Sequence, residues 1–256
     1  MSRLEGLFSK KKNNVLNVYC TAGYPQLNCT VEVIKALQDN GADMVEIGMP
    51  YSDPLADGPV IQNSSTIALE NGMTIATLFS QLKNVRETIH VPLILMGYMN
   101  PVLQYGIERF CKDAQSVGID GVILPDLPMY EFETMYKDLF HQNGLDFIFL
   151  VTPETGEERI RKIDELSSGF LYAVSSSSTT GNSKPISSQE DYFKKLHDLG
   201  LRNPVLVGFG IKDKETFTAA CAHTAGAIIG SAYIKELDGQ SDVGPVTKKF
   251  LKTVIG

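Results

Sequence analysis

The stretch "NGADMVEIG" at residues 40–48 is the first of four similar segments in the chain. The others are "VGIDGVILP" at 117–125, "NGLDFIFLV" at 143–151 and "TAGAIIGS" at 224–231. In each of them a glycine precedes a short apolar run. Glycine is the usual left-handed residue at a helix end, and a continuous apolar run is typical of a strand buried on both faces. The repeat therefore predicts helices that lead into buried parallel strands.

Four further apolar runs, "VLNVYCT", "VPLILMG", "GFLYAVS" and "PVLVGFG", raise the number of predicted strands to eight. The predicted strands lie near residues 15–21, 43–48, 91–97, 121–125, 146–151, 169–175, 204–208 and 226–230. The clearest helical spacings between them are Ile107, Phe110, Cys111, Ala114 and Phe132, Met135, Tyr136, Leu139, Phe140. No strand leads into G-x-G-x-x-G, so an open doubly wound sheet fits the pattern less well than a (β/α)8 TIM barrel. We therefore predict an α/β fold, with residues 1–256 forming a single TIM-barrel domain.

Composition excludes several classes of function. The net charge is −7, and the one dense basic run, Lys10 to Lys12, lies near the N-terminus and forms no stripe or aromatic-interleaved patch. Nucleic acid is therefore not expected as a partner. No apolar segment approaches the roughly 18 residues of a membrane span, and residues 1–12 lack signal-peptide features, so we expect a cytoplasmic protein without membrane contact. The four cysteines and four histidines are scattered without ligand spacing, so no metal site is expected.

Three carboxylates follow or interrupt the second predicted strand. In TIM barrels the chemistry takes place at the C-terminal ends of the strands. Glu46 lies within the apolar run "MVEIG", where burial without a partner costs several kcal/mol or raises the pKa. A catalytic glutamate and a structural one, held by backbone amides or a lysine, both fit. Asp53 and Asp57 follow in "SDPLADGP", where ordinary turn-forming aspartates are the alternative.

Small residues follow three of the later strands, in "SSSSTTG" at 175–181, "GFGI" at 208–211 and "GSA" at 230–232. Backbone N–H groups and hydroxyls of this kind can hold a phosphate without Lys or Arg. Tyr19, Tyr98 and Tyr172 lie at strand ends, where they either line a flat apolar ligand or pack in the core. The residues alone thus indicate a small phosphorylated substrate with an apolar part, and they leave the reaction open.

The longer stretch "VEIGMPYSDPLADGP" at 45–59 resembles the signature of the tryptophan synthase alpha family. "TAGYP" at 21–25, "GYMNP" at 97–101, "GVILPDLP" at 121–128, "GFGI" and "GSA" follow in the family's order and spacing. The resemblance spans nearly the whole chain. It implies a lyase of tryptophan biosynthesis, a barrel that cleaves indole-3-glycerol phosphate by a retro-aldol reaction into indole and glyceraldehyde 3-phosphate.

The resemblance also implies roles for individual residues. Glu46 matches the acid/base group that protonates the indole C3 and takes the proton of the adjacent hydroxyl. Asp57 matches the carboxylate that hydrogen-bonds the indole N1–H. The implied indole-pocket residues are Tyr19, Tyr98 and Tyr172, and the implied residues for the phosphate and the closing loop are Thr180, Gly181, Gly210, Gly230 and Ser231.

The family implies a beta subunit that receives indole directly, usually in an αββα assembly. Pyridoxal phosphate would belong to that subunit, and this chain would need no cofactor. The docking face would include Asp53, Pro54 and Pro128. Three alternatives stay open: a sugar-phosphate isomerase or epimerase, which would lack the loop motif at 45–59; a lyase that works without a partner; and a mainly regulatory subunit with negligible activity of its own.

Overall fold

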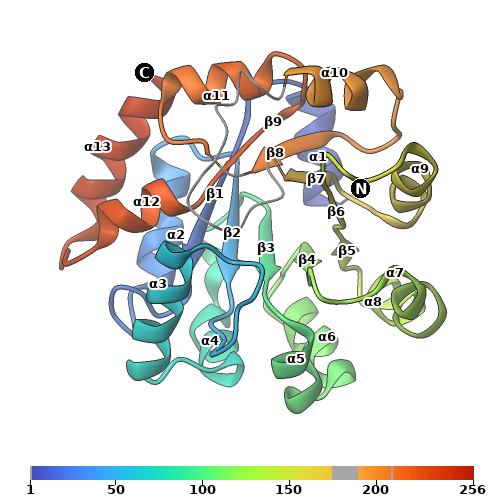
Figure 1. Cartoon of the computed structure of the whole chain (residues 1–256). Helices are drawn as coiled ribbons and strands as arrows, with labels where there is room; N and C mark the ends of the chain where they lie inside the picture. Colours follow the sequence, from blue (N-terminus) through green and yellow to red (C-terminus); the bar gives the residue numbers. More distant parts are fainter. Residues whose placement is uncertain (1, 175–189, 209) are drawn as a thin grey trace.

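The protein is described by a computed structural model covering residues 2–174, 190–208 and 210–256. Its strands are parallel neighbours in one sheet, in the order β5-β4-β3-β2-β1-β9-β8-β7-β6. In Figure 1 they form a ring with helices around it. The strands are β1 Val15–Thr21, β2 Met44–Gly48, β3 Leu93–Met96, β4 Gly121–Ile123, β5 Asp146–Phe147, β6 Leu150–Val151, β7 Leu171–Val174, β8 Val205–Gly208 and β9 Gly226–Ile229.

The ring closes through residues 146–151, which contain both β5 and β6 and which the sequence predicts as one strand. The first half pairs with β4, where the N–H of Ile148 donates to the carbonyl of Val122 at 3.0 Å. The second half pairs with β7, where the N–H of Tyr172 donates to the carbonyl of Phe149 at 3.0 Å. Both edges of the sheet therefore meet in one stretch of chain. The eight predicted strands and the TIM barrel are confirmed.

Helices connect the strands and cover the outside of the ring (Figure 1). They are α1 Arg3–Lys10, α2 Thr30–Asp39, α3 Pro59–Glu70, α4 Ile75–Leu82, the 3-10 helix η1 Val85–Glu87, α5 Met99–Tyr105, α6 Ile107–Ser116, α7 Met129–Glu131, the π-helix η2 Phe132–Tyr136, α8 Lys137–Gln142, α9 Glu157–Leu166, α10 Glu190–Asp198, α11 Lys214–Cys221, α12 Ser231–Leu237 and α13 Val243–Ile255. Within the described ranges, none of these helices has the length and apolar character needed to cross a bilayer.

The glycines of the repeated segments take two different roles. Gly41, Gly118 and Gly144 have φ values of 101°, 81° and 64°, so they end helices in the left-handed conformation, as predicted. Gly226 instead lies inside β9, where an added Cβ would stand 2.1 Å from the carbonyl oxygen of Val15. The helix-end prediction is wrong for this fourth segment, because its glycine permits two strands to approach closely.

The predicted apolar face between residues 132 and 140 is only partly correct. Phe132 and Phe140 are buried, but Met135 is 64% exposed. Residues Phe132–Tyr136 form a π-helical turn, which holds more residues than an α-helical turn. Met135 is therefore rotated away from the face that a regular α-helix would bury.

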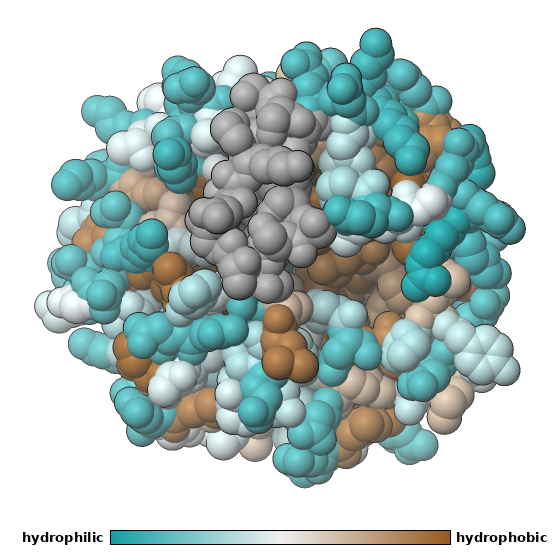
Figure 2. Space-filling view, viewed as in Figure 1, coloured by the Kyte–Doolittle hydropathy of each residue, from teal (hydrophilic) through white to brown (hydrophobic). Residues whose placement is uncertain are grey.

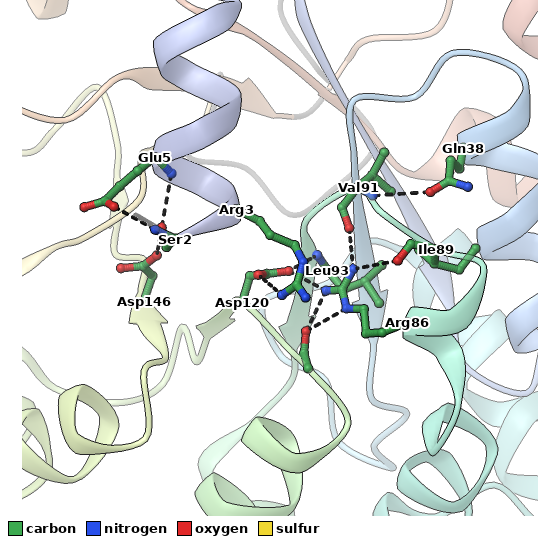
Figure 3. A network of polar contacts seen from close by, with 11 residues as sticks. Ser2, Arg3, Glu5, Gln38, Arg86, Ile89, Val91, Leu93, Asp120 and Asp146 are labelled. Atoms are coloured by element: carbon green, nitrogen blue, oxygen red, sulfur yellow. Dashed lines mark hydrogen bonds and ion pairs between the residues drawn. The ribbon is translucent and has the colours of Figure 1, made fainter.

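The N-terminal end of the barrel is covered by α1, which lies on the far side in Figure 1. Leu4 of α1 is completely buried. Asp120, just before β4, accepts hydrogen bonds from Arg3 of α1 at 3.0 Å, from the N–H of Leu93 at 2.8 Å and from Arg86 (Figure 3). These contacts join α1 to the starts of β3 and β4. The closed end of the barrel is thus opposite the end where the strands terminate.

Candidate active site

Glu46 lies inside the barrel near the C-terminal end of β2. Its side chain is only 1% exposed, and in the sheet it stands beside Tyr19 of β1 and Ile94 of β3. The charge of Glu46 acts on Tyr172 of β7, which belongs to a distant part of the sheet order. A side chain that is close to both β1 and β7 must point into the barrel interior. The carboxyl group is therefore held by a rigid strand at the end of the fold where chemistry is expected.

The surroundings of Glu46 keep it protonated at neutral pH. Burial raises its pKa from 4.5 to about 8, the hydrogen bond from Asn17 opposes this rise, and the nearby charge of Asp57 adds to it. The Nδ2 of Asn17 donates to Oε2 of Glu46 at 2.9 Å. A carboxyl group with a pKa near the working pH can both give and accept a proton. This property separates Glu46 from a structural glutamate held permanently charged by a lysine.

Asp57 approaches the same site from the loop between β2 and α3. The hydroxyl of Tyr98 donates to Oδ2 of Asp57 at 3.0 Å and accepts a hydrogen bond from the N–H of Ala56, also at 3.0 Å. One tyrosine after β3 thus fixes two successive residues of the loop. Burial raises the pKa of Asp57 to about 6, although the Tyr98 hydroxyl works in the opposite direction. Asp57 is therefore charged at pH 7 while Glu46 is not.

Tyr19 and Tyr172 are buried within the barrel, on β1 and β7. Each hydroxyl lies against a glycine. A Cβ added to Gly48 would stand 1.9 Å from the Tyr19 oxygen, and one added to Gly208 would stand 2.2 Å from the Tyr172 oxygen. The two glycines therefore make room for the two rings. Tyr98, the third predicted pocket residue, contacts the loop through its hydroxyl.

The residues predicted to hold phosphate follow β8 and β9. Gly210 is the second residue after β8 and has φ +79°, a conformation that favours glycine. Gly230 separates β9 from α12, and Ser231 is the first residue of that helix. These residues share the C-terminal end of the barrel with Glu46. Thr180 and Gly181 lie outside the described residues.

The residues predicted to contact a partner differ in exposure. Asp53 and Pro128 are exposed, whereas Pro54 is buried within the chain. Next to Pro54, Leu55 is 86% exposed. In Figure 2, hydrophobic residues gather near the middle of the displayed face beside the grey atoms, within a largely hydrophilic border.

Sequence reasoning missed Asn17 altogether, and it missed the way in which Tyr98 supports Asp57. Asn17 holds Glu46, and a sign of it was visible, because an amide interrupts the apolar run "VLNVYC". Tyr98 was predicted as a pocket wall, and its hydrogen bonds to Ala56 and Asp57 had no sequence signal. Such contacts link segments that are far apart in the chain.

Comparisons with known proteins place the chain in a family. The family described as "Tryptophan synthase alpha chain" matches residues 7–253. The tryptophan synthase alpha chain of Flavobacterium psychrophilum is 53% identical over 249 residues, which are 97% of this chain and 98% of that protein. That of Parabacteroides distasonis is 48% identical over 255 residues, 99% of each chain.

A solved structure extends the likeness to the fold. Tryptophan synthase subunit alpha from Legionella pneumophila superposes with a TM-score of 0.89 at 31% sequence identity, covering 99% of this chain and 97% of that one. By sequence and by fold, the chain belongs to the tryptophan synthase alpha chain family, the enzyme subunits that cleave indole-3-glycerol phosphate in tryptophan biosynthesis.

Proposed function

We propose that Glu46 and Asp57 carry out the cleavage of indole-3-glycerol phosphate in this chain, with Glu46 as the acid/base group and Asp57 as the charge stabiliser. The observation that carries this assignment is the buried carboxyl of Glu46, whose pKa is raised to about 8 inside the barrel. Burying an ionisable group of this kind costs stability, so its presence indicates a functional role.

The reaction requires two proton movements. The C3 atom of the indole gains a proton, the bond between C3 and the glycerol chain breaks, and the electrons of that bond stay with the indole. The side-chain hydroxyl on the adjacent carbon loses its proton and becomes the aldehyde of glyceraldehyde 3-phosphate. One group between these atoms can serve both movements, and Glu46 exchanges its proton in the right pH range.

Asp57 would act on the ring nitrogen. Protonation of C3 withdraws electrons from N1 and makes the N1–H more acidic. A carboxylate that accepts a hydrogen bond from N1–H stabilises this developing positive charge. With a pKa of about 6, Asp57 is ionised at pH 7 and able to accept it. Tyr98 would keep this carboxylate in place through its hydroxyl.

The remainder of the substrate would be held by neutral groups. We assign the indole pocket to Tyr19, Tyr98 and Tyr172. The phosphate would bind to Thr180, Gly181, Gly210, Gly230 and Ser231, through backbone N–H groups and hydroxyls. Support for this comes from the positions of Gly210 and Ser231, each two residues after a strand and at the same end of the barrel as Glu46.

As a member of an alpha-chain family, the chain has a beta subunit as its partner, and pyridoxal phosphate belongs to that subunit. We further infer an αββα assembly, a cytoplasmic location and a single domain over residues 1–256. The exposed residues Asp53 and Pro128 would lie on the docking face. Pro54, which is buried and accepts a hydrogen bond from the N–H of Asp57 at 3.0 Å, would contribute by shaping the loop.

The test is indole formation by Glu46→Gln and Asp57→Asn, each with and without a beta subunit. Loss of an acid/base group lowers the rate by about 10²–10⁴. We expect losses in that range for both variants, with melting temperatures no lower than that of the parent chain. Asp39→Asn, on the exposed side of α2, is the matched control and keeps full activity. Undiminished indole formation by Glu46→Gln would refute the assignment.

A further inference from the structure

Asn17 is a buried polar residue, and only one of its two polar side-chain atoms has a hydrogen-bond partner among the described residues. It lies in β1, has no exposed surface, and donates from Nδ2 to Glu46 at 2.9 Å. Its other polar atom, Oδ1, is buried and has no hydrogen-bond partner among the described residues. Leaving a buried carbonyl oxygen unpaired costs stability, so an apolar side chain would suit this strand better.

We propose that Asn17 is a positioning residue for Glu46 that bonds this carboxyl group in both of its protonation states. The inference rests on the acid/base role proposed for Glu46. The structure shows the Nδ2 of Asn17 donating to Oε2 of Glu46, which is the arrangement that a carboxylate requires because it can only accept. When Glu46 is protonated, the carboxamide turns over about its last side-chain bond, and Oδ1 accepts the hydrogen bond from the carboxylic acid.

The chemistry of the amide suits this task. A carboxamide is neutral and carries donors and an acceptor at matching positions, whereas Lys and Arg carry donors alone. A positive charge would also stabilise the carboxylate strongly and fix Glu46 in its ionised form. Because Oδ1 has no other partner among the described residues, turning the amide breaks no bond on that side.

Among the residues that the structure describes, the other titratable groups that interact electrostatically with Glu46 do not change charge in the same range. Tyr19 and Cys20 of β1 and Tyr172 of β7 all have pKa values raised by burial, so they stay neutral around pH 8. The pKa of Asp57 is about 6, so Asp57 is already ionised there. On the side of β3 the neighbour in register is the apolar Ile94. A transition near pH 8 therefore reports Glu46.

The first experiment compares the pH dependence of indole formation in the parent chain, Asn17→Leu and the control Asn143→Leu. Asn143 is a second buried asparagine, which donates to the carbonyl of Leu139 at 2.8 Å, away from Glu46. A hydrogen bond to a charged group is stronger than one to a neutral group. The pH–rate profile of the parent chain should have a limb near pH 8, set by the ionisation of Glu46. Removing Asn17 should move the midpoint of this limb to higher pH, by about one pH unit.

In Asn143→Leu the limb should stay in place, even if the protein is less stable. A purely structural role for Asn17 would lower the melting temperature of Asn17→Leu without moving the limb, and that result would overturn the proposal. Should Asn17→Leu fail to fold, the second experiment decides, since it uses the parent side chain.

The second experiment follows the side-chain amide of Asn17 by ¹H–¹⁵N NMR during a pH titration. We expect its resonances to shift with a midpoint near pH 8 in the parent chain and to stay constant in Glu46→Gln. Resonances that ignore pH in the parent chain, or that still titrate in Glu46→Gln, contradict the proposal. The readout needs no turnover, so it separates failure of this inference from failure of the catalytic role of Glu46.

Discussion

At the scale of single residues, Glu46 makes the stability of the fold depend on pH. Its pKa is raised by burial from 4.5 to about 8 in the folded chain. Below about pH 4.5 the folded and unfolded chains both hold this proton, and above about pH 8 both have lost it. Between these values the unfolded chain alone releases it. The free energy of unfolding therefore falls as the pH rises through this window.

The substitution Glu46→Gln removes this dependence, because glutamine does not ionise. We expect the variant to gain stability relative to the parent as the pH rises from about 5 to about 8, reaching a few kcal/mol at the upper end. Urea unfolding at a series of pH values measures the difference. Asp57 titrates in both proteins and cancels in the comparison. Two curves that run parallel from pH 5 to 8 would contradict the prediction.

Residues differ in how far their roles could be read from the sequence. Glu46 could be found because a carboxylate within an apolar strand is conspicuous, and Asn17 carried a similar sign. The contact between Tyr98 and Asp57 could not, since it joins a strand end to a loop 41 positions earlier. Local patterns report burial, and they do not report which distant side chain completes a hydrogen bond.

At the scale of elements, the contacts of α1 hold the closed end of the barrel together (Figure 3). The Asp120 side chain is 4% exposed, Arg86 is 17% exposed and Arg3 is 45% exposed. The salt bridge from Asp120 to Arg86 is thus mostly buried, whereas the one to Arg3 is open to water. Pairs of these two kinds differ widely in what their removal costs.

Asp120→Ala and Arg3→Ala should therefore have unequal effects. Asp120→Ala leaves Arg86 without this carboxylate and the N–H of Leu93 without its acceptor, so we expect a loss of about 3–5 kcal/mol in unfolding free energy. Arg3→Ala should cost about 1 kcal/mol or less. Chemical denaturation measures both. At denaturant concentrations too low to unfold the protein, both variants should keep their indole-forming activity, because the network lies at the end of the barrel opposite Glu46. Equal losses of stability in the two variants would contradict the prediction.

The elements were well predicted where a regular period applied and less well where it broke. The eight strands follow from apolar runs that must be buried on both faces. The π-helical turn at Phe132–Tyr136 moved Met135 out of the predicted face. Whether a helix accommodates an extra residue in one turn depends on how it packs, and the spacing of apolar residues in the sequence does not reveal it.

At the scale of the whole molecule, the barrel separates its stabilising end from its reactive end. The loop between β2 and α3 carries the carboxylate of Asp57 toward the interior, while Asp53 and Leu55 of the same loop are exposed. Exposed apolar side chains also follow Pro128, where Tyr130 is 75% exposed. One short segment thus contacts the site and faces outward. The number of subunits in the complex was not predictable from these residues, because the surface of another chain sets it.

This arrangement leads to a prediction about the partner. We expect a beta subunit to speed indole formation, and Asp53→Ala to reduce that stimulation about tenfold while leaving the rate of the isolated chain unchanged, because the partner would order the loop that carries Asp57. Asp39→Ala, an exposed aspartate on α2, should keep the full stimulation. Indole assays with increasing beta subunit measure both the maximal rate and the half-saturating concentration. If Asp53→Ala reached the parent rate at saturation, the loop would not transmit the presence of the partner through this residue.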